Sequence, residues 1–113
     1  MTRCPAKEFT DDLSYGMRLS LVRDCIFKAA SENGDDYVAA WNECTRDGCL
    51  GDVPLERLRA DIIQKVANMI ATHADILDLG IAHAWDGWEI VKERQAVMRL
   101  VDFLRWLVEP WRG

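Results

Sequence analysis

Cysteine, histidine and carboxylate side chains are the groups in this sequence that can support chemistry. The cysteines are Cys4, Cys25, Cys44 and Cys49, and the last two have four residues between them, a spacing found in half-sites for structural zinc. Zinc needs two further ligands, with Cys4 and His83 as candidates, but no second half-site follows. We therefore expect reduced thiols, with Cys25 and Cys44 packed as small apolar groups. A disulfide between Cys44 and Cys49 is the alternative for an exported chain.

His73 lies in the middle of a predicted apolar helix face, where it is a candidate metal ligand or proton-transfer group. A single histidine on such a face is more often a core residue hydrogen-bonded to a neighbour, and we adopt that interpretation. Asp75 with Asp78, and Glu89 with Glu93, have spacings at which helices hold Mg²⁺. Helical geometry places the first pair opposite the apolar side of its helix and the second pair at the edge of the apolar side of the next helix. We therefore expect these carboxylates to be exposed to solvent. A small metal- or His-dependent enzyme with a carboxylate cluster near His73 is the alternative function.

Five tryptophans are many for a chain of 113 residues. Trp88 and Trp106 are 18 residues apart, so on one helix they share a direction, with Lys92 and Arg99 between them. Trp111 follows in a short tail. Three explanations are open: burial under other parts of the chain, stacking of nucleic-acid bases, and contact with another protein. Tryptophan and arginine dominate interface hot spots, so the protein interface is the leading functional hypothesis.

The charge is acidic and unevenly placed. The sequence has 19 acidic and 14 basic residues, a net charge of −5, which disfavours general binding to a phosphate backbone. Residues 32–52 carry much of the excess, and a negative surface there would meet a basic partner. The alternative is that these acids stabilise helix N-termini. The carboxylates of this segment that we select as partner-binding candidates are Glu32, Asp35, Asp36, Glu43 and Asp47.

Apolar periodicity predicts an all-α fold without strands. We expect one domain over residues 1–113, folded as a compact four-helix antiparallel bundle of three long helices and one short helix. Thr10 is the predicted N-cap of the first helix and Asp86 that of the last, while Gly80 is predicted to end the third in the left-handed conformation. The predicted helices cover about residues 11–32, 36–47, 54–79 and 87–109.

The apolar positions of the last predicted helix form one wide stripe. Its expected centre, which we predict to face the core, is Ile90, Val97, Val101, Leu104 and Val108, and it is widened by Leu100, Phe103 and Leu107.

These observations predict a small acidic helical protein that works by binding rather than catalysis, as an adaptor, inhibitor or accessory subunit of a larger complex. By analogy alone with phage-type inhibitors, such a protein could block a basic nucleic-acid-binding groove of its partner. The expected partner is another protein or a second copy of the chain, with no cofactor, no membrane and no direct nucleic-acid contact. The N-terminus lacks an apolar signal segment, and no uncharged stretch is long enough to span a bilayer, which predicts a cytoplasmic location.

Overall fold

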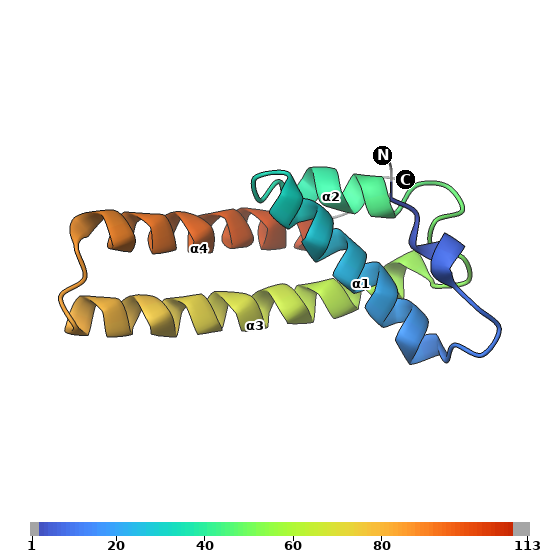
Figure 1. Cartoon of the computed structure of the whole chain (residues 1–113), viewed down its shortest axis with the longest axis horizontal. Coiled ribbons are helices and arrows are strands. Elements are labelled where there is room, and N and C mark those ends of the chain that lie inside the picture. Colours follow the sequence, from blue (N-terminus) through green and yellow to red (C-terminus); the bar gives the residue numbers. More distant parts are fainter. Residues whose placement is uncertain (1–2, 110–113) are drawn as a thin grey trace. The chain divides into compact units, whose positions relative to one another are not determined.

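The computed structural model describes residues 3–109. These residues form α-helices and one short 3₁₀ helix, with no strand among them, so the all-α prediction of three long helices and one short helix is confirmed. The chain divides into two compact units, Met1–Ile62 and Ile63–Gly113, with the boundary inside the third α-helix. The elements are η1 (Pro5–Glu8), α1 (Tyr15–Glu32), α2 (Tyr37–Cys44), α3 (Leu55–Ala82) and α4 (Gly87–Val108) (Figure 1).

In the first unit, α1 begins later than predicted. Its N-cap is Ser14, whose Oγ accepts a hydrogen bond from the Met17 N–H at 3.2 Å. The predicted cap, Thr10, instead donates its hydroxyl to the Asp12 carboxylate in the preceding turn. Both Thr10 and Ser14 have the short oxygen-bearing side chain that a cap requires, so the residue type could not choose between them.

The second helix begins where the sequence indicated. The Asp36 carboxylate caps α2 by accepting from the Ala39 N–H at 3.1 Å. The helix ends at Cys44 rather than at residue 47, and the Thr45 hydroxyl donates to the Trp41 carbonyl at 2.7 Å. The same carbonyl also accepts the Thr45 N–H at 3.0 Å, so the C-cap residue bonds to it through both its backbone and its side chain.

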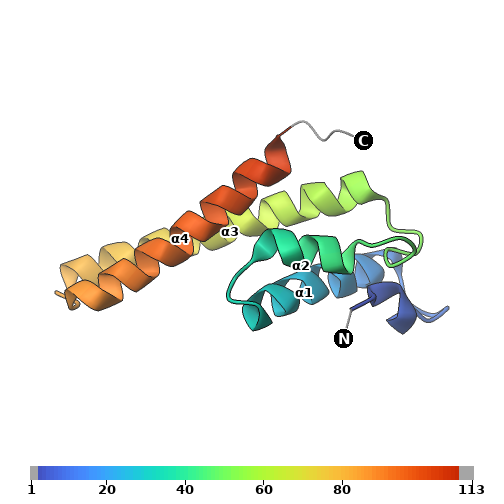
Figure 2. The ribbon, with the colours of Figure 1, turned by 90° about the horizontal axis from the view of Figure 1, so that it is seen from above.

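The core of the first unit lies between α1, α2 and the start of α3, and α1 and α2 lie side by side (Figure 2). The Arg23 guanidinium on α1 reaches the Asp61 carboxylate on α3 at 3.4 Å at the edge of this core. The most buried side chains of the unit include Val22, Ile26 and Ala29 of α1, Trp41 and Cys44 of α2, and Leu58 and Ile62 of α3.

In the second unit, α3 turns back into α4. The helix continues through Gly80 to Ala82, so the predicted end at Gly80 is wrong. The Trp85 N–H donates to the Gly80 carbonyl at 2.9 Å and the Ala84 N–H to the Ile81 carbonyl at 3.2 Å, the two hydrogen bonds of a Schellman motif. The left-handed position of this motif is Ala84, with φ 57°, in place of the usual glycine.

Gly80 has a packing role instead. A Cβ atom at this position would lie 2.3 Å from Cε3 of Trp85, so the indole ring occupies the space that a side chain would need. The next residue, Asp86, caps α4 as predicted and accepts from the Glu89 N–H at 2.9 Å. The turn between α3 and α4 is therefore fixed by a glycine–tryptophan contact and by an N-cap directly after it.

The buried side of α4 differs from the predicted centre of its stripe. Leu100, Phe103 and Leu107 are buried, whereas Val108 is 53% exposed. The fully buried positions thus lie on the part of the predicted stripe that was expected to widen it, about 100° around the helix from the series ending at Val108. The remaining members of that series are half-buried: Ile90, Val97, Val101 and Leu104. Apolar residues occupy both arcs, so periodicity alone could not choose between them.

Candidate functional site

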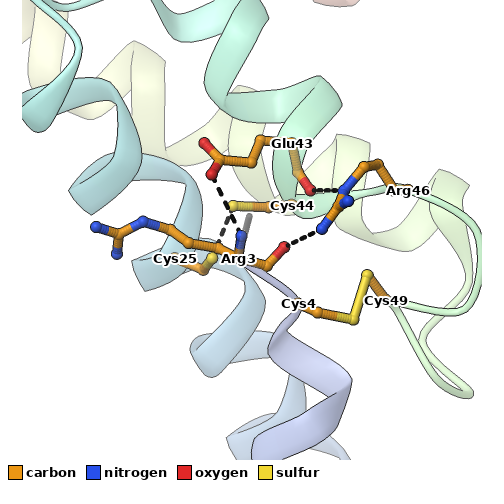
Figure 3. The surroundings of a disulfide bond; sticks show 7 residues. All are labelled: Arg3, Cys4, Cys25, Glu43, Cys44, Arg46 and Cys49. Atoms are coloured by element: carbon orange, nitrogen blue, oxygen red, sulfur yellow. Dashed lines mark hydrogen bonds between the residues drawn. A yellow bond between two sulfur atoms is a disulfide. The ribbon is translucent and has the colours of Figure 1, made fainter. Parts of the chain in front are cut away.

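The four cysteines lie in the first unit as two pairs (Figure 3). Cys4 and Cys49 form a disulfide with Cα atoms 4.7 Å apart, and the Sγ atoms of Cys25 and Cys44 lie 2.7 Å apart. The expected reduced state of Cys4 and Cys49 is therefore wrong, and so is the alternative of a Cys44–Cys49 disulfide. The sequence distance misleads because α2 ends at Cys44, and the following loop carries Cys49 to the N-terminal segment.

Polar contacts hold the N-terminal segment beside this cluster. The Arg3 N–H donates to the Glu43 carboxylate at 3.2 Å, and the Arg46 guanidinium donates to the carbonyls of Arg3 at 3.0 Å and Glu43 at 2.9 Å. The Ala6 N–H donates to the Cys49 carbonyl at 3.0 Å. The guanidinium of Arg3 pairs with the Glu32 carboxylate at the end of α1. Several contacts thus hold the N-terminal segment, and with it the disulfide, against α1, α2 and the loop after α2.

The two thiols of the second pair have different environments. Cys44 is fully buried and Cys25 is half-buried. The hydrogen bond with Cys44 lowers the pKa of Cys25, and the charge of Arg3 lowers it further against the opposing effect of burial. The same hydrogen bond, together with burial, raises the pKa of Cys44. Cys25 is therefore the thiol that ionises first.

A pocket of about 370 Å³ opens beside Cys25 and also reaches Cys4. Its wall carries basic side chains from the N-terminal segment and from α1 together with two carboxylates. The charged residues are Arg3, Lys7, Lys28, Glu8 and Asp24.

Three of the five acidic candidates of residues 32–52 make contacts within the first unit. Glu32 pairs with Arg3, Asp36 caps α2, and Glu43 accepts from the Arg3 N–H. Asp35 is half-buried at a left-handed backbone position with φ 64°, and Asp47 is exposed. Glu32, Asp36 and Glu43 thus contribute to the fold of the unit, and for Asp36 this is the role that the helix-terminus interpretation gave it.

The two tryptophans predicted to share one exposed direction differ. Trp88 is 66% exposed, and the Lys92 ammonium lies 5.9 Å from the centre of its ring. Trp106 is half-buried and stacks against Phe103, with ring centres 6.1 Å apart and planes 22° apart. The buried arc of α4 brings Phe103 inside and so carries Trp106 to the edge of the core. Trp111 lies outside the described residues.

Two further apolar residues of α4, which the sequence analysis did not single out, are exposed on the same side of the helix as Trp88. Val91 is 42% exposed and Met98 58% exposed. Because these positions follow Trp88 by 3 and 10 residues, all three side chains lie on one side of α4, and the exposed cations of Lys92 and Arg99 flank them. We call this set the α4 outer face: Trp88, Val91, Lys92, Met98 and Arg99.

His73 is hydrogen-bonded to a neighbour, as expected, but it is half-buried rather than a core residue. Its Nδ1 contacts the Glu93 carboxylate, which joins α3 to α4 within the second unit. Asp75, Asp78 and Glu89 are exposed and are not part of this contact. In residues 3–109 no group of three histidine, cysteine, aspartate or glutamate side chains is placed to hold a metal ion.

No family model matches the chain, and no solved structure matches it. A mitotic spindle checkpoint protein, MAD2 of Arabidopsis thaliana, is 24% identical over 97 residues, which cover 86% of this chain. The chain spans about half the length of that protein, with 46% of it covered. No helix among residues 3–109 combines the length and apolar character needed to cross a membrane.

Proposed function

We propose that this protein is a small helical protein-interaction module, an adaptor, inhibitor or accessory subunit that contacts its partner through the α4 outer face. The observation that supports the proposal is the exposure of Trp88. A tryptophan that is 66% exposed leaves a large apolar surface in contact with water. Such side chains commonly provide the largest part of the binding energy when a partner buries them.

The rest of the α4 outer face fits the same role. Val91 and Met98 extend the apolar surface along the helix, and methionine adapts to partners of different shape. Lys92 and Arg99 provide a basic edge, which suits a partner whose apolar groove is flanked by carboxylates. The partner that we propose is therefore a protein with an apolar groove and an acidic rim.

A role for the acidic segment as a phosphate mimic has less support. Blocking a basic groove requires carboxylates that point to solvent, whereas Glu32, Asp36 and Glu43 are engaged within the first unit. Binding of a basic partner at residues 32–52 stays a prediction, and we place the principal contact on α4.

The Cys4–Cys49 disulfide indicates the kind of cellular compartment in which the protein acts. Disulfides persist in oxidising environments and are rare in the cytosol, so the Cys4–Cys49 bond favours an oxidising compartment over the cytoplasm expected from the N-terminal sequence. We propose that the module acts in such a compartment.

Alanine substitutions on α4 test the proposed contact. Trp88→Ala and Met98→Ala each remove an exposed apolar side chain, and Met17→Ala in the first unit is a matched control because Met17 is 53% exposed. Once the partner has been captured and identified, titration calorimetry should show Trp88→Ala weakening binding by roughly tenfold or more, and Met17→Ala leaving it unchanged. Equal affinities for all variants, or unfolding of Trp88→Ala, would contradict the proposal.

A further inference from the structure

Cys25 and Cys44 are the two thiols that remain beside the Cys4–Cys49 disulfide. They face each other from α1 and from the last residue of α2, with Sγ atoms 2.7 Å apart (Figure 3). Nonbonded sulfur atoms normally lie farther apart, and a covalent bond brings them to about 2.05 Å. We propose that Cys25 and Cys44 are an oxidation site that closes a second disulfide, nested in sequence inside the first.

Access to the pair is one-sided. Cys44 is fully buried, whereas Cys25 is half-buried and lines the pocket of about 370 Å³. An incoming oxidant therefore meets the sulfur of Cys25 first. The hydrogen bond from Cys44 and the charge of Arg3, which lower the pKa of Cys25, favour the thiolate needed for attack on a disulfide.

The pocket indicates the class of oxidant. Its wall carries the cations of Lys7 and Lys28 and the carboxylates of Glu8 and Asp24, and the Arg3 guanidinium at its edge is paired with Glu32. Lys7 and Lys28 are cations that can pair with the carboxylates of an incoming small disulfide, such as oxidised glutathione, as it approaches Cys25.

The reaction balances without any other reagent. The Cys25 thiolate, having lost its proton to water, attacks one sulfur of oxidised glutathione, and one glutathione thiolate leaves. Cys44 then loses its proton and attacks the Cys25 sulfur of the mixed disulfide, and the second glutathione thiolate leaves. The two cysteines lose two electrons in total, and the glutathione disulfide gains both.

Mass spectrometry tests the product. The protein is first treated with a limiting amount of a dithiol reductant, so that Cys25 and Cys44 are both thiols. It is then incubated with oxidised glutathione, and any thiols that remain are alkylated. We expect no alkylated cysteine, a mass lower by two hydrogens than that of the protein with both thiols, and a peptide in which Cys25 and Cys44 are linked. Two alkylated thiols, a glutathione retained on Cys25 of the native chain, or a link from Cys25 to Cys4 or Cys49 would each overturn the proposal.

Single variants test the order of the two steps. Without the second thiol, Cys44→Ser should retain one glutathione on Cys25. Because Cys44 is fully buried, Cys25→Ser should take up glutathione at least tenfold more slowly. Equal uptake by the two variants would contradict the assigned roles, and far-UV circular dichroism confirms that each variant is folded before its uptake is compared.

Charge substitution tests the pocket. Lys28→Ala should slow the reaction with oxidised glutathione by roughly threefold and leave the reaction with uncharged hydroxyethyl disulfide unchanged. Lys65→Ala, an exposed lysine on α3, is the control and should change neither rate. A Lys28→Ala rate that is unaltered with glutathione would show that the pocket does not select the oxidant's charge.

Discussion

At the scale of single residues, the two histidines have opposite environments. His73 is half-buried and contacts Glu93 across the second unit, whereas His83 is exposed in the turn after α3. The sequence predicted this difference, because His73 lies at an apolar helical spacing and His83 in a short connection. It could not predict Glu93 as the partner, since that choice depends on the register between α3 and α4.

We expect His73→Ala to lower the free energy of unfolding of the second unit by about 1 kcal/mol, because it leaves a partly buried carboxylate without its partner. His83→Ala should change it by less than about 0.5 kcal/mol, as is usual for an exposed side chain. Urea unfolding followed by tryptophan fluorescence measures both. Equal effects of the two substitutions would mean that the His73–Glu93 contact contributes nothing to stability.

For the tryptophans and the cysteines, residue type and spacing did not predict which side chains are buried or paired. The exposure of Trp88 agrees with its predicted direction, but Trp106 shares that direction and is half-buried against Phe103. Side-chain direction on a helix is set by sequence spacing, whereas burial depends on what packs beside each turn. The pairing of Cys4 with Cys49 is a tertiary property of the same kind, and the spacing of Cys44 and Cys49 pointed to the wrong pair.

At the scale of elements, the helices themselves were predictable and their ends only in part. Asp86 was predicted as a cap from its own type and the apolar pattern after it, whereas residue 36 was predicted only as the start of its helix. Two other signals misled: Thr10 has cap chemistry but forms a turn, and Gly80 is a packing position inside α3. Glycine serves both for left-handed backbone and for close packing, and only the position of the Trp85 ring distinguishes the two.

Two of the glycines inside helices, Gly80 and Gly16, should respond in opposite directions to alanine. Gly80→Ala should destabilise the second unit by about 1–3 kcal/mol, because its Cβ would lie 2.3 Å from the Trp85 ring. Gly16→Ala, near the start of α1 where a Cβ meets nothing within 4 Å, should stabilise the first unit by roughly 0.5 kcal/mol. Thermal unfolding measures both. Stabilisation by Gly80→Ala would show that the ring does not occupy that space.

In the same turn, Ala84 is a residue that glycine should replace with a gain in stability. Ala84 adopts φ 57°, which costs about 1 kcal/mol for a residue with a Cβ. Ala84→Gly should therefore raise the stability of the second unit by up to about that amount, and Ala82→Gly, inside the last turn of α3, should lower it. Chemical denaturation of the two variants against the wild type gives both signs.

At the scale of the whole molecule, the disulfide is the longest-range constraint described. It joins residues 45 positions apart, and closing a loop of that size stabilises a fold by about 2–4 kcal/mol. We expect the double variant Cys4→Ser, Cys49→Ser to destabilise the first unit by about this amount. Amide hydrogen exchange should show reduced protection in α1 and α2 and unchanged protection at the turn between α3 and α4, and uniform loss across the chain would contradict this assignment.

The Cys4–Cys49 bond also changes how the chain responds to cleavage of its backbone. A protease that cuts once in the loop before α1 or in the loop after α2, on the N-terminal side of Cys49, leaves two pieces that are still covalently joined. Such a nicked molecule migrates as one species on a gel without reductant and as two once reductant is added. Processing inside this loop can therefore create a new chain end while both pieces stay together.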